Sequence, residues 1–71
     1  MGTEAIEQTA AEVLKAQIKK LSSQAVKAKM DLHDLAEDLP INWQSILDVA
    51  THAYNTYQQL ESLKAQFREA E

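Results

Sequence analysis

The sequence predicts an all-α fold, an antiparallel two-helix hairpin that dimerises into a four-helix bundle. From residue 14 to residue 39, apolar residues recur at alternating spacings of four and three. This is the 3.5-residue period of a helix that packs along another helix. The chain of 71 residues has one Pro and one Gly, which leaves room for a single break. It has no internal repeat, and residues 1–71 are therefore expected to form one domain.

The first helix is expected over about residues 5–39. Thr9 and Glu12 have the T-x-x-E spacing of a capping box, so the regular part of the helix is expected to begin near Thr9. Pro40 ends it, because proline lacks an N–H and disfavours helical angles in the residue before it. The apolar residues of this helix form a seam: Leu14, Ile18, Leu21, Ala25, Ala28, Leu32, Leu35 and Leu39.

The hairpin corner is predicted at residues 40–42 and the second helix at about residues 43–70. Asn42 is expected to cap the second helix, and Ile41 and Ile46 have the spacing of a hydrophobic staple. So short a connection makes the two helices antiparallel neighbours. Trp43 could form an exposed recognition patch with Tyr54 and Tyr57, but the favoured expectation is that Trp43 packs over the corner. The second helix has a wider apolar stripe: Ile46, Val49, Ala50, Ala53, Tyr57, Leu60, Leu63 and Phe67.

A single hairpin leaves both apolar stripes half exposed, and the usual remedy is to pair two hairpins into a four-helix bundle. We therefore predict a homodimer whose interface uses Leu14, Ile18, Leu21, Ala25, Ala28, Leu32 and Leu35. The methyl side chains of Ala25 and Ala28 allow another helix to approach closely. If two first helices pair antiparallel, the lysines between Lys15 and Lys29 of one chain lie along the acidic stretch Asp31 to Asp38 of the other. This charge pattern favours the antiparallel orientation.

The composition argues against an enzyme, a membrane protein and a disulfide-bonded protein. The chain has no Cys, which excludes disulfides and thiolate metal sites. It has no Gly-rich phosphate loop, and no Ser has a His and an acid arranged around it in the sequence. No apolar run reaches the length of a signal-peptide core or a membrane span, so the expected location is the cytoplasm.

The segment from Lys29 to Pro40 reads KMDLHDLAEDLP, and Asn42–Trp43 and the turn from Val49 to Tyr54 follow it. These residues resemble the Rop-like family, short helical proteins encoded beside nitrogen-fixation genes in bacteria, some of which are described as metalloproteins. The resemblance covers about residues 18–60. It implies a helical-hairpin dimer, a non-catalytic accessory role with a nitrogenase-related protein partner, and binding of a divalent or ferric metal.

Two groups of side chains have the spacing of metal ligands: His33, Asp34 and Glu37, with Asp31, Asp48 and His52 as the alternative. In each group a His lies four residues from a carboxylate on one helix face, a common ligand geometry for Fe, Ni or Zn. The competing interpretation is that both groups are solvated surface charge. Acidic residues near the end of the first helix also oppose its dipole. The unfavourable interaction with the helix dipole suggests that these carboxylates have another role. They could bind a metal, a basic partner, or lysines from a second chain.

An alternative function from a different class is RNA binding, because the dimeric bundle that gives the Rop-like family its name binds paired RNA loops. The phosphate contacts would come from the lysines of the first helix: Lys15, Lys19, Lys20, Lys27 and Lys29. The net charge of −4, the acidic block beside these lysines and the lack of interleaved aromatic residues all argue against nucleic acid. A protein partner is therefore the favoured interpretation.

Overall fold

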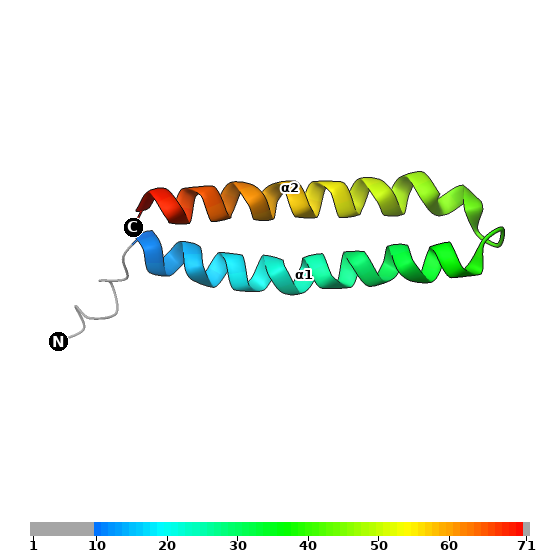
Figure 1. The fold of residues 1–71 in the computed structure, drawn as a ribbon, viewed down its shortest axis with the longest axis horizontal. Coiled ribbons are helices and arrows are strands. Elements are labelled where there is room, and N and C mark those ends of the chain that lie inside the picture. The colour runs from blue at the N-terminus through cyan, green and yellow to red at the C-terminus, as the bar shows by residue number, and fades with distance from the viewer. Residues whose placement is uncertain (1–9, 71) are drawn as a thin grey trace.

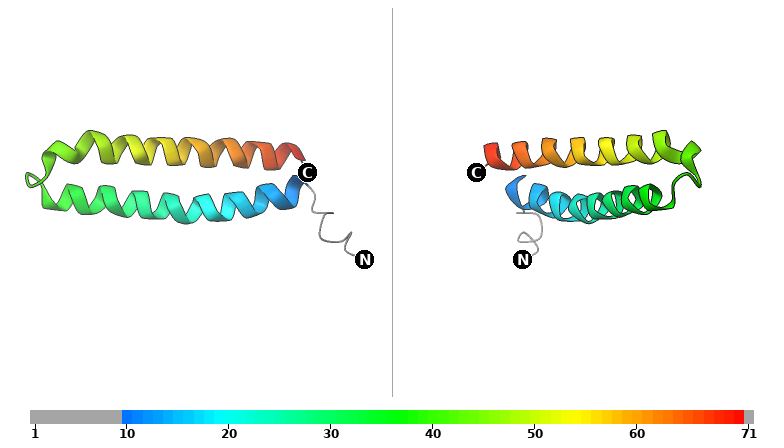
Figure 2. Two further views of the ribbon diagram at one scale, coloured as in Figure 1. Left: turned by 180° about the vertical axis from the view of Figure 1, so that it is seen from behind. Right: turned by 45° about the vertical axis from the view of Figure 1, so that its right-hand side comes forward.

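The protein folds into two long helices that run antiparallel beside each other (Figure 1). The computed structural model describes residues 10–70. Helix α1 spans Ala10–Asp38, a single 3₁₀ turn, η2, spans Trp43–Ser45, and helix α2 spans Ile46–Ala70. The three views in Figures 1 and 2 agree that the helices stay adjacent along their whole length. The predicted all-α hairpin is confirmed.

The observed helix boundaries differ slightly from the predicted ones. Residues 5–9 lie outside the described residues, and with them Thr9 of the predicted capping box. Glu12 lies in the first turn of α1. Helix α1 ends at Asp38, where Pro40 interrupts the backbone ladder and the next N–H, that of Ile41, donates to the Asp38 carbonyl at 2.9 Å. The second helical segment begins at Trp43 as a 3₁₀ turn and becomes α-helical at Ile46.

Asn42 lies at the N-cap position of η2, as predicted, but the predicted side-chain cap is wrong. Its φ of 64° and ψ of 26° are left-handed, and its side chain makes no capping hydrogen bond. The backbone carbonyl of Asn42 accepts instead from the N–H of Ser45 at 2.9 Å. Asparagine is one of the few residues besides glycine that adopts this conformation readily. Asn42 therefore suits the left-handed backbone conformation of the corner.

The stability of variants at position 42 is expected to depend on how readily the new residue adopts a left-handed conformation, and not on how well it caps a helix. Serine caps helices about as well as asparagine but adopts the left-handed region poorly, so Asn42→Ser is expected to lower the free energy of unfolding by about 1 kcal/mol. Asn42→Gly is expected to leave it unchanged or to raise it. Urea denaturation of both variants at one protein concentration measures the difference. A neutral Asn42→Ser together with a destabilising Asn42→Gly would restore the capping role.

The most deeply buried side chains of the hairpin are small, and they lie near the middle of the two helices. Ala25 and Ala28 of α1 are 2% and 1% exposed, and Ala53 and Thr56 of α2 are also buried. Leu60 continues this buried row one turn further along α2. Small side chains at a helix–helix contact allow a short interaxial distance. The side of α1 that carries the alternating apolar residues therefore packs against α2 of the same chain.

Two hydroxyl groups are satisfied within this contact. The Thr56 hydroxyl donates to the His52 carbonyl one turn earlier at 2.8 Å, which permits a polar residue at a buried position. The Tyr57 hydroxyl crosses from α2 to α1 and donates to the Ala25 carbonyl at 3.1 Å. Thr56 was not part of the predicted apolar stripe, whereas Tyr57 was and does contact α1.

The hairpin is a single layer of two helices. Its cross-section is 24 Å by 14 Å, and the shorter value is close to the diameter of one helix with its side chains. No large side chain among the described residues is fully buried. Neither α1 nor α2 is apolar over enough of its length to cross a membrane.

Candidate functional site

The residues of the predicted dimer interface are partly buried within the hairpin itself. Leu14, Ile18, Leu21 and Leu35 are half-buried, and Leu32 stays more than a third exposed. Ala25 and Ala28 have almost no surface left, because α2 of the same chain covers them. The prediction that these two alanines meet a second copy is therefore corrected: they are the close contact between α1 and α2.

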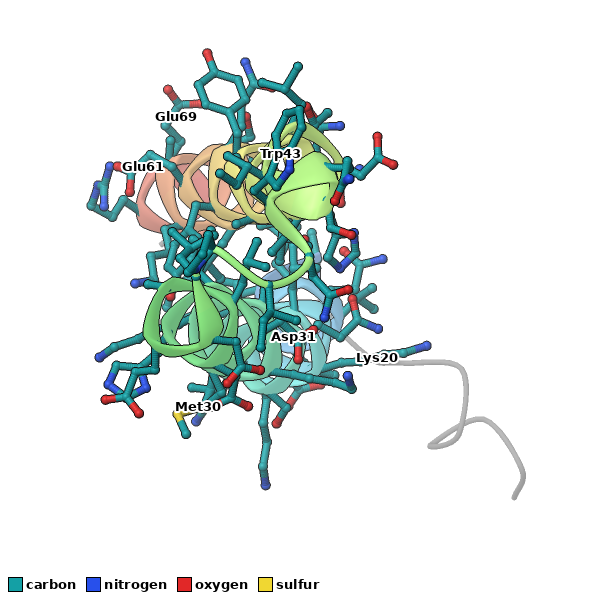
Figure 3. All side chains as sticks on the ribbon, turned by 90° about the vertical axis from the view of Figure 1, so that its right-hand side faces the viewer. Lys20, Met30, Asp31, Trp43, Glu61 and Glu69 are labelled. Carbon is teal, nitrogen blue, oxygen red and sulfur yellow. The ribbon has the colours of Figure 1, made fainter. Side chains whose placement is uncertain are left out.

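The hairpin has two broad faces of different character. One, which we call the tyrosine face, carries Tyr54 and Tyr57 on α2, and helical periodicity places Val26 on the same side of α1. All three are more than 40% exposed. Glu61, one turn after Tyr57, marks this side in Figure 3, while Lys20 and Asp31 lie on the opposite side. A depression of about 540 Å³ lies along α2 beside Tyr54 and Tyr57.

The opposite face, which we call the glutamine face, holds a shallow groove between the helices of about 540 Å³. Half of its eight lining residues are glutamines: the lining consists of Gln17, Lys20, Leu21 and Gln24 from α1, with Gln58, Gln59, Ser62 and Leu63 from α2. Gln58 and Ser62 also border the depression beside Tyr54 and Tyr57. None of the eight lining residues is a His, Cys, Asp or Glu. The groove therefore offers no acid and base pair for catalysis.

The first predicted metal group does not converge on one point. The Nδ1 atom of His33 lies 3.8 Å from Asp34, and its Nε2 atom lies 3.5 Å from Glu37. Because the two nitrogens point in different directions from the ring, the two carboxylates flank the imidazole on separate sides. All three side chains are exposed. The arrangement offers at most one imidazole nitrogen and one carboxylate to a single ion.

The alternative metal group is not brought together either. The carboxylate of Asp31 lies 3.4 Å from the Lys27 ammonium one turn earlier. Asp48 and His52 remain one turn apart on α2, exposed. Across residues 10–70, no three side chains of His, Cys, Asp or Glu are placed to hold a metal ion.

The remaining metal prediction is a two-ligand contact at His33 and Glu37. A pair of exposed ligands one turn apart leaves most coordination positions to water, so we expect Ni²⁺ to bind only in the millimolar range. Titration of Ni²⁺ against the NMR signals of His33 and His52 measures this. Broadening centred on His33 that is lost in His33→Ala supports the pair. A response confined to His52 would move the contact to α2, and no response at either His would remove the metal prediction.

Trp43 contradicts the prediction that it packs over the corner. Its side chain is 60% exposed, and Figure 3 places it on the α2 side of the corner, away from α1. Ile41 and Leu47 beside it are also exposed. The predicted staple between Ile41 and Ile46 therefore buries little of Ile41.

The lysines proposed for RNA contact are exposed and spread around α1. Lys27 is paired with Asp31, and Lys20 lines the glutamine groove. Adjacent residues such as Lys19 and Lys20 point about 100° apart on a helix, so the lysines do not form one stripe. This distribution gives no support to a phosphate-tracking surface.

A family model described as Rop-like matches residues 9–71. The chain belongs to the Rop-like family. The match extends the resemblance from the KMDLHDLAEDLP segment to both helices of the hairpin, and it includes every described residue. No solved structure matches the chain.

Several Rop-like relatives have substantial sequence identity. A UPF0437 protein of Azorhizobium caulinodans is 60% identical over 60 residues, which cover 84% of this chain and 87% of the relative. A UPF0437 protein of Trichormus variabilis is 48% identical over 97% of this chain and 80% of its own length. A Frankia alni protein named "UPF0437 protein in nifX-nifW intergenic region" is 51% identical over 66% of this chain and 57% of the relative.

Proposed function

We propose that this Rop-like protein is a homodimeric four-helix bundle that acts as a non-catalytic accessory protein in nitrogen fixation, through contact with a protein partner. The single observation that carries the dimer is the one-layer fold. Four of the five buried residues are no larger than threonine, and eleven large hydrophobic side chains among the described residues are exposed. A monomer with so small a core gains only a few kcal/mol, about 3–5, from burial.

The tyrosine face is the surface that a second copy would cover. Tyr54, Tyr57 and Val26 place apolar area there, and the depression along α2 can receive side chains from a facing helix. The glutamine face is polar by comparison. Stacking two hairpins on their tyrosine faces makes a two-layer bundle in which each helix has two neighbours.

The charge pattern supports an antiparallel arrangement of the two hairpins. All seven Lys and Arg residues lie outside residues 30–63, whereas six of the eleven acidic residues lie within this range. The residues on both sides of the corner are thus acidic, and the basic residues lie farther from the corner along both helices. Antiparallel stacking places unlike charges next to each other, and parallel stacking would place like charges together.

The nitrogen-fixation setting is supported by a relative and not by the geometry. The Frankia alni protein is named for its place in a nifX-nifW intergenic region. The glutamine groove has Lys20 as its one ionisable lining residue and so holds no acid beside a base, which supports a role in which the bundle acts by binding.

The setting is tested by deleting the gene in the bacterium that carries it. We expect slower growth and lower acetylene reduction when dinitrogen is the nitrogen source, with growth on ammonium unchanged. Expression of the wild-type chain from a plasmid should restore both. Unchanged acetylene reduction in the deletion strain would contradict the proposed function.

A further inference from the structure

Four large apolar side chains are exposed in and beside the corner of the hairpin. The corner patch, as we define it, consists of Leu39, Ile41, Trp43 and Leu47. Ile41 is 66%, Trp43 60% and Leu47 78% exposed. Contiguous exposed apolar residues of this size commonly mark an interaction surface, and Trp is among the residues most enriched at the energetic centre of interfaces.

A second copy on the tyrosine face would leave much of this patch uncovered. Figure 3 looks at the hairpin end-on from the corner, and Trp43 lies in front of α2, on the side away from α1. Met30 marks the narrow edge beyond α1, while Glu61 and Lys20 mark the two broad faces. A hairpin stacked on a broad face covers side chains that point to that face, and the corner end with Trp43 stays open.

Acidic residues flank the corner patch along the chain. Glu37 and Asp38 end α1, where the last turn has no basic residue, and Asp48 lies in the first turn of α2. Within residues 10–70, neither Asp38 nor Asp48 has an ion-pair partner. The nearest Lys or Arg in the sequence is Lys29 on one side and Lys64 on the other. Carboxylates at the C-terminus of α1 also oppose the helix dipole.

We propose that the corner patch docks a protein helix that presents apolar side chains flanked by Lys or Arg. The apolar residues of such a helix would cover Trp43, Ile41 and Leu47, and its cations would pair with Asp38 and Asp48. An apolar centre with a charged rim is the usual organisation of a protein interface. The patch gives the chemistry of the partner in the accessory role proposed above, and the inference rests on that role for its biological setting.

The single Trp of the chain makes the patch directly observable. The probe is a synthetic helical peptide of about 18 residues with leucines along one face and lysines on both flanks. A matched peptide carries Glu in place of every Lys. We expect the Lys peptide to shift the emission of Trp43 to shorter wavelength in a saturable way and to bind more weakly in about 0.5 M NaCl. The Glu peptide is expected to have no effect.

Variants test the apolar centre and the acidic rim separately, with binding followed by fluorescence from a dye on the peptide. Ile41→Ser with Leu47→Ser is expected to weaken binding at least tenfold, and so is Asp38→Asn with Asp48→Asn. Met30→Ala removes an exposed apolar side chain away from the patch, and Glu61→Gln removes an acid that pairs with Arg68 on α2. Both controls are expected to bind the peptide as the wild type does.

Three results would overturn the proposal. Equal binding by the rim variant and by Glu61→Gln would show that Asp38 and Asp48 make no specific contact with the peptide. An unchanged Trp43 emission at saturating peptide would place the contact elsewhere. A shift of the emission on raising the protein concentration alone, with no effect of peptide, would show that a second copy covers the patch. In the deletion strain, complementation by the Ile41→Ser and Leu47→Ser variant tests the patch in cells. A strain without a growth defect contradicts the accessory role instead, and the peptide measurements still decide the patch.

Discussion

Replacement of Ala28 by glutamate is expected to unfold the chain. Ala28 is 1% exposed in the contact between α1 and α2, so a longer side chain must force the helices apart or bury its carboxylate. An uncompensated buried charge costs about 3–5 kcal/mol, which is comparable with the whole stability expected of a core this small. Circular dichroism at 222 nm and a thermal scan at fixed protein concentration measure the loss.

A matched control lies two residues further along the same helix. Met30 is half exposed, and Figure 3 shows its side chain pointing away from α2. Met30→Glu introduces the same group and is expected to change the free energy of unfolding by less than about 0.5 kcal/mol. If Ala28→Glu keeps the wild-type melting temperature, the close contact of α1 with α2 is not where the structure places it.

The sequence was sufficient to predict the hairpin. The alternating spacing from Leu14 to Leu39, which ends at Pro40, predicts two helices and one corner. The structure has these elements within a few residues of the expected boundaries. Periodicity predicts helices well because it records which side of each helix is buried. It does not record which helix covers that side, so the alanines assigned to a second copy were found against α2 of the same chain.

Two residues were misjudged because residue type was weighed above position. Thr56 was left out of the apolar stripe as a polar residue, although the spacing Ala53, Thr56, Leu60 places it in the seam. Its back-bond to His52 removes the cost of burying the hydroxyl. Trp43 was assigned to the core as a large aromatic residue, although a one-layer corner has nothing above it to form a core.

Ligand spacing in the sequence was less informative than helix spacing. A separation of four residues places His33 and Glu37 on one helix face. The structure confirms this, because the Nε2 atom of His33 lies 3.5 Å from the Oε2 atom of Glu37. Spacing does not determine the rotamer of the ring, and the side-chain geometry separates Asp34 from Glu37 around His33. Convergence of three ligands depends on such rotamers and on contacts between elements, which periodicity does not contain.

Charging the tyrosine face is expected to abolish the homodimer. The double variant Val26→Glu with Tyr54→Glu places four carboxylates in an interface between two copies, where they lack partners and repel one another. We expect sedimentation equilibrium at micromolar concentration to change from about 16 kDa, twice the 8.0 kDa of one chain, to 8.0 kDa. If one hairpin is unstable without a second copy, the change in mass is accompanied by a loss of helical signal in circular dichroism.

The glutamine face supplies a control with the same added charge. Gln24 and Gln59 line the groove of that face, and Gln24→Glu with Gln59→Glu is expected to leave the mass at about 16 kDa. If this control becomes monomeric while the tyrosine-face variant stays dimeric, the second copy covers the glutamine face. A wild-type chain that remains at 8.0 kDa throughout the micromolar range would contradict the dimer itself. The two faces differ mainly in Tyr54, Tyr57 and Val26 against amides, so the comparison measures whether apolar area selects the face on which the bundle closes.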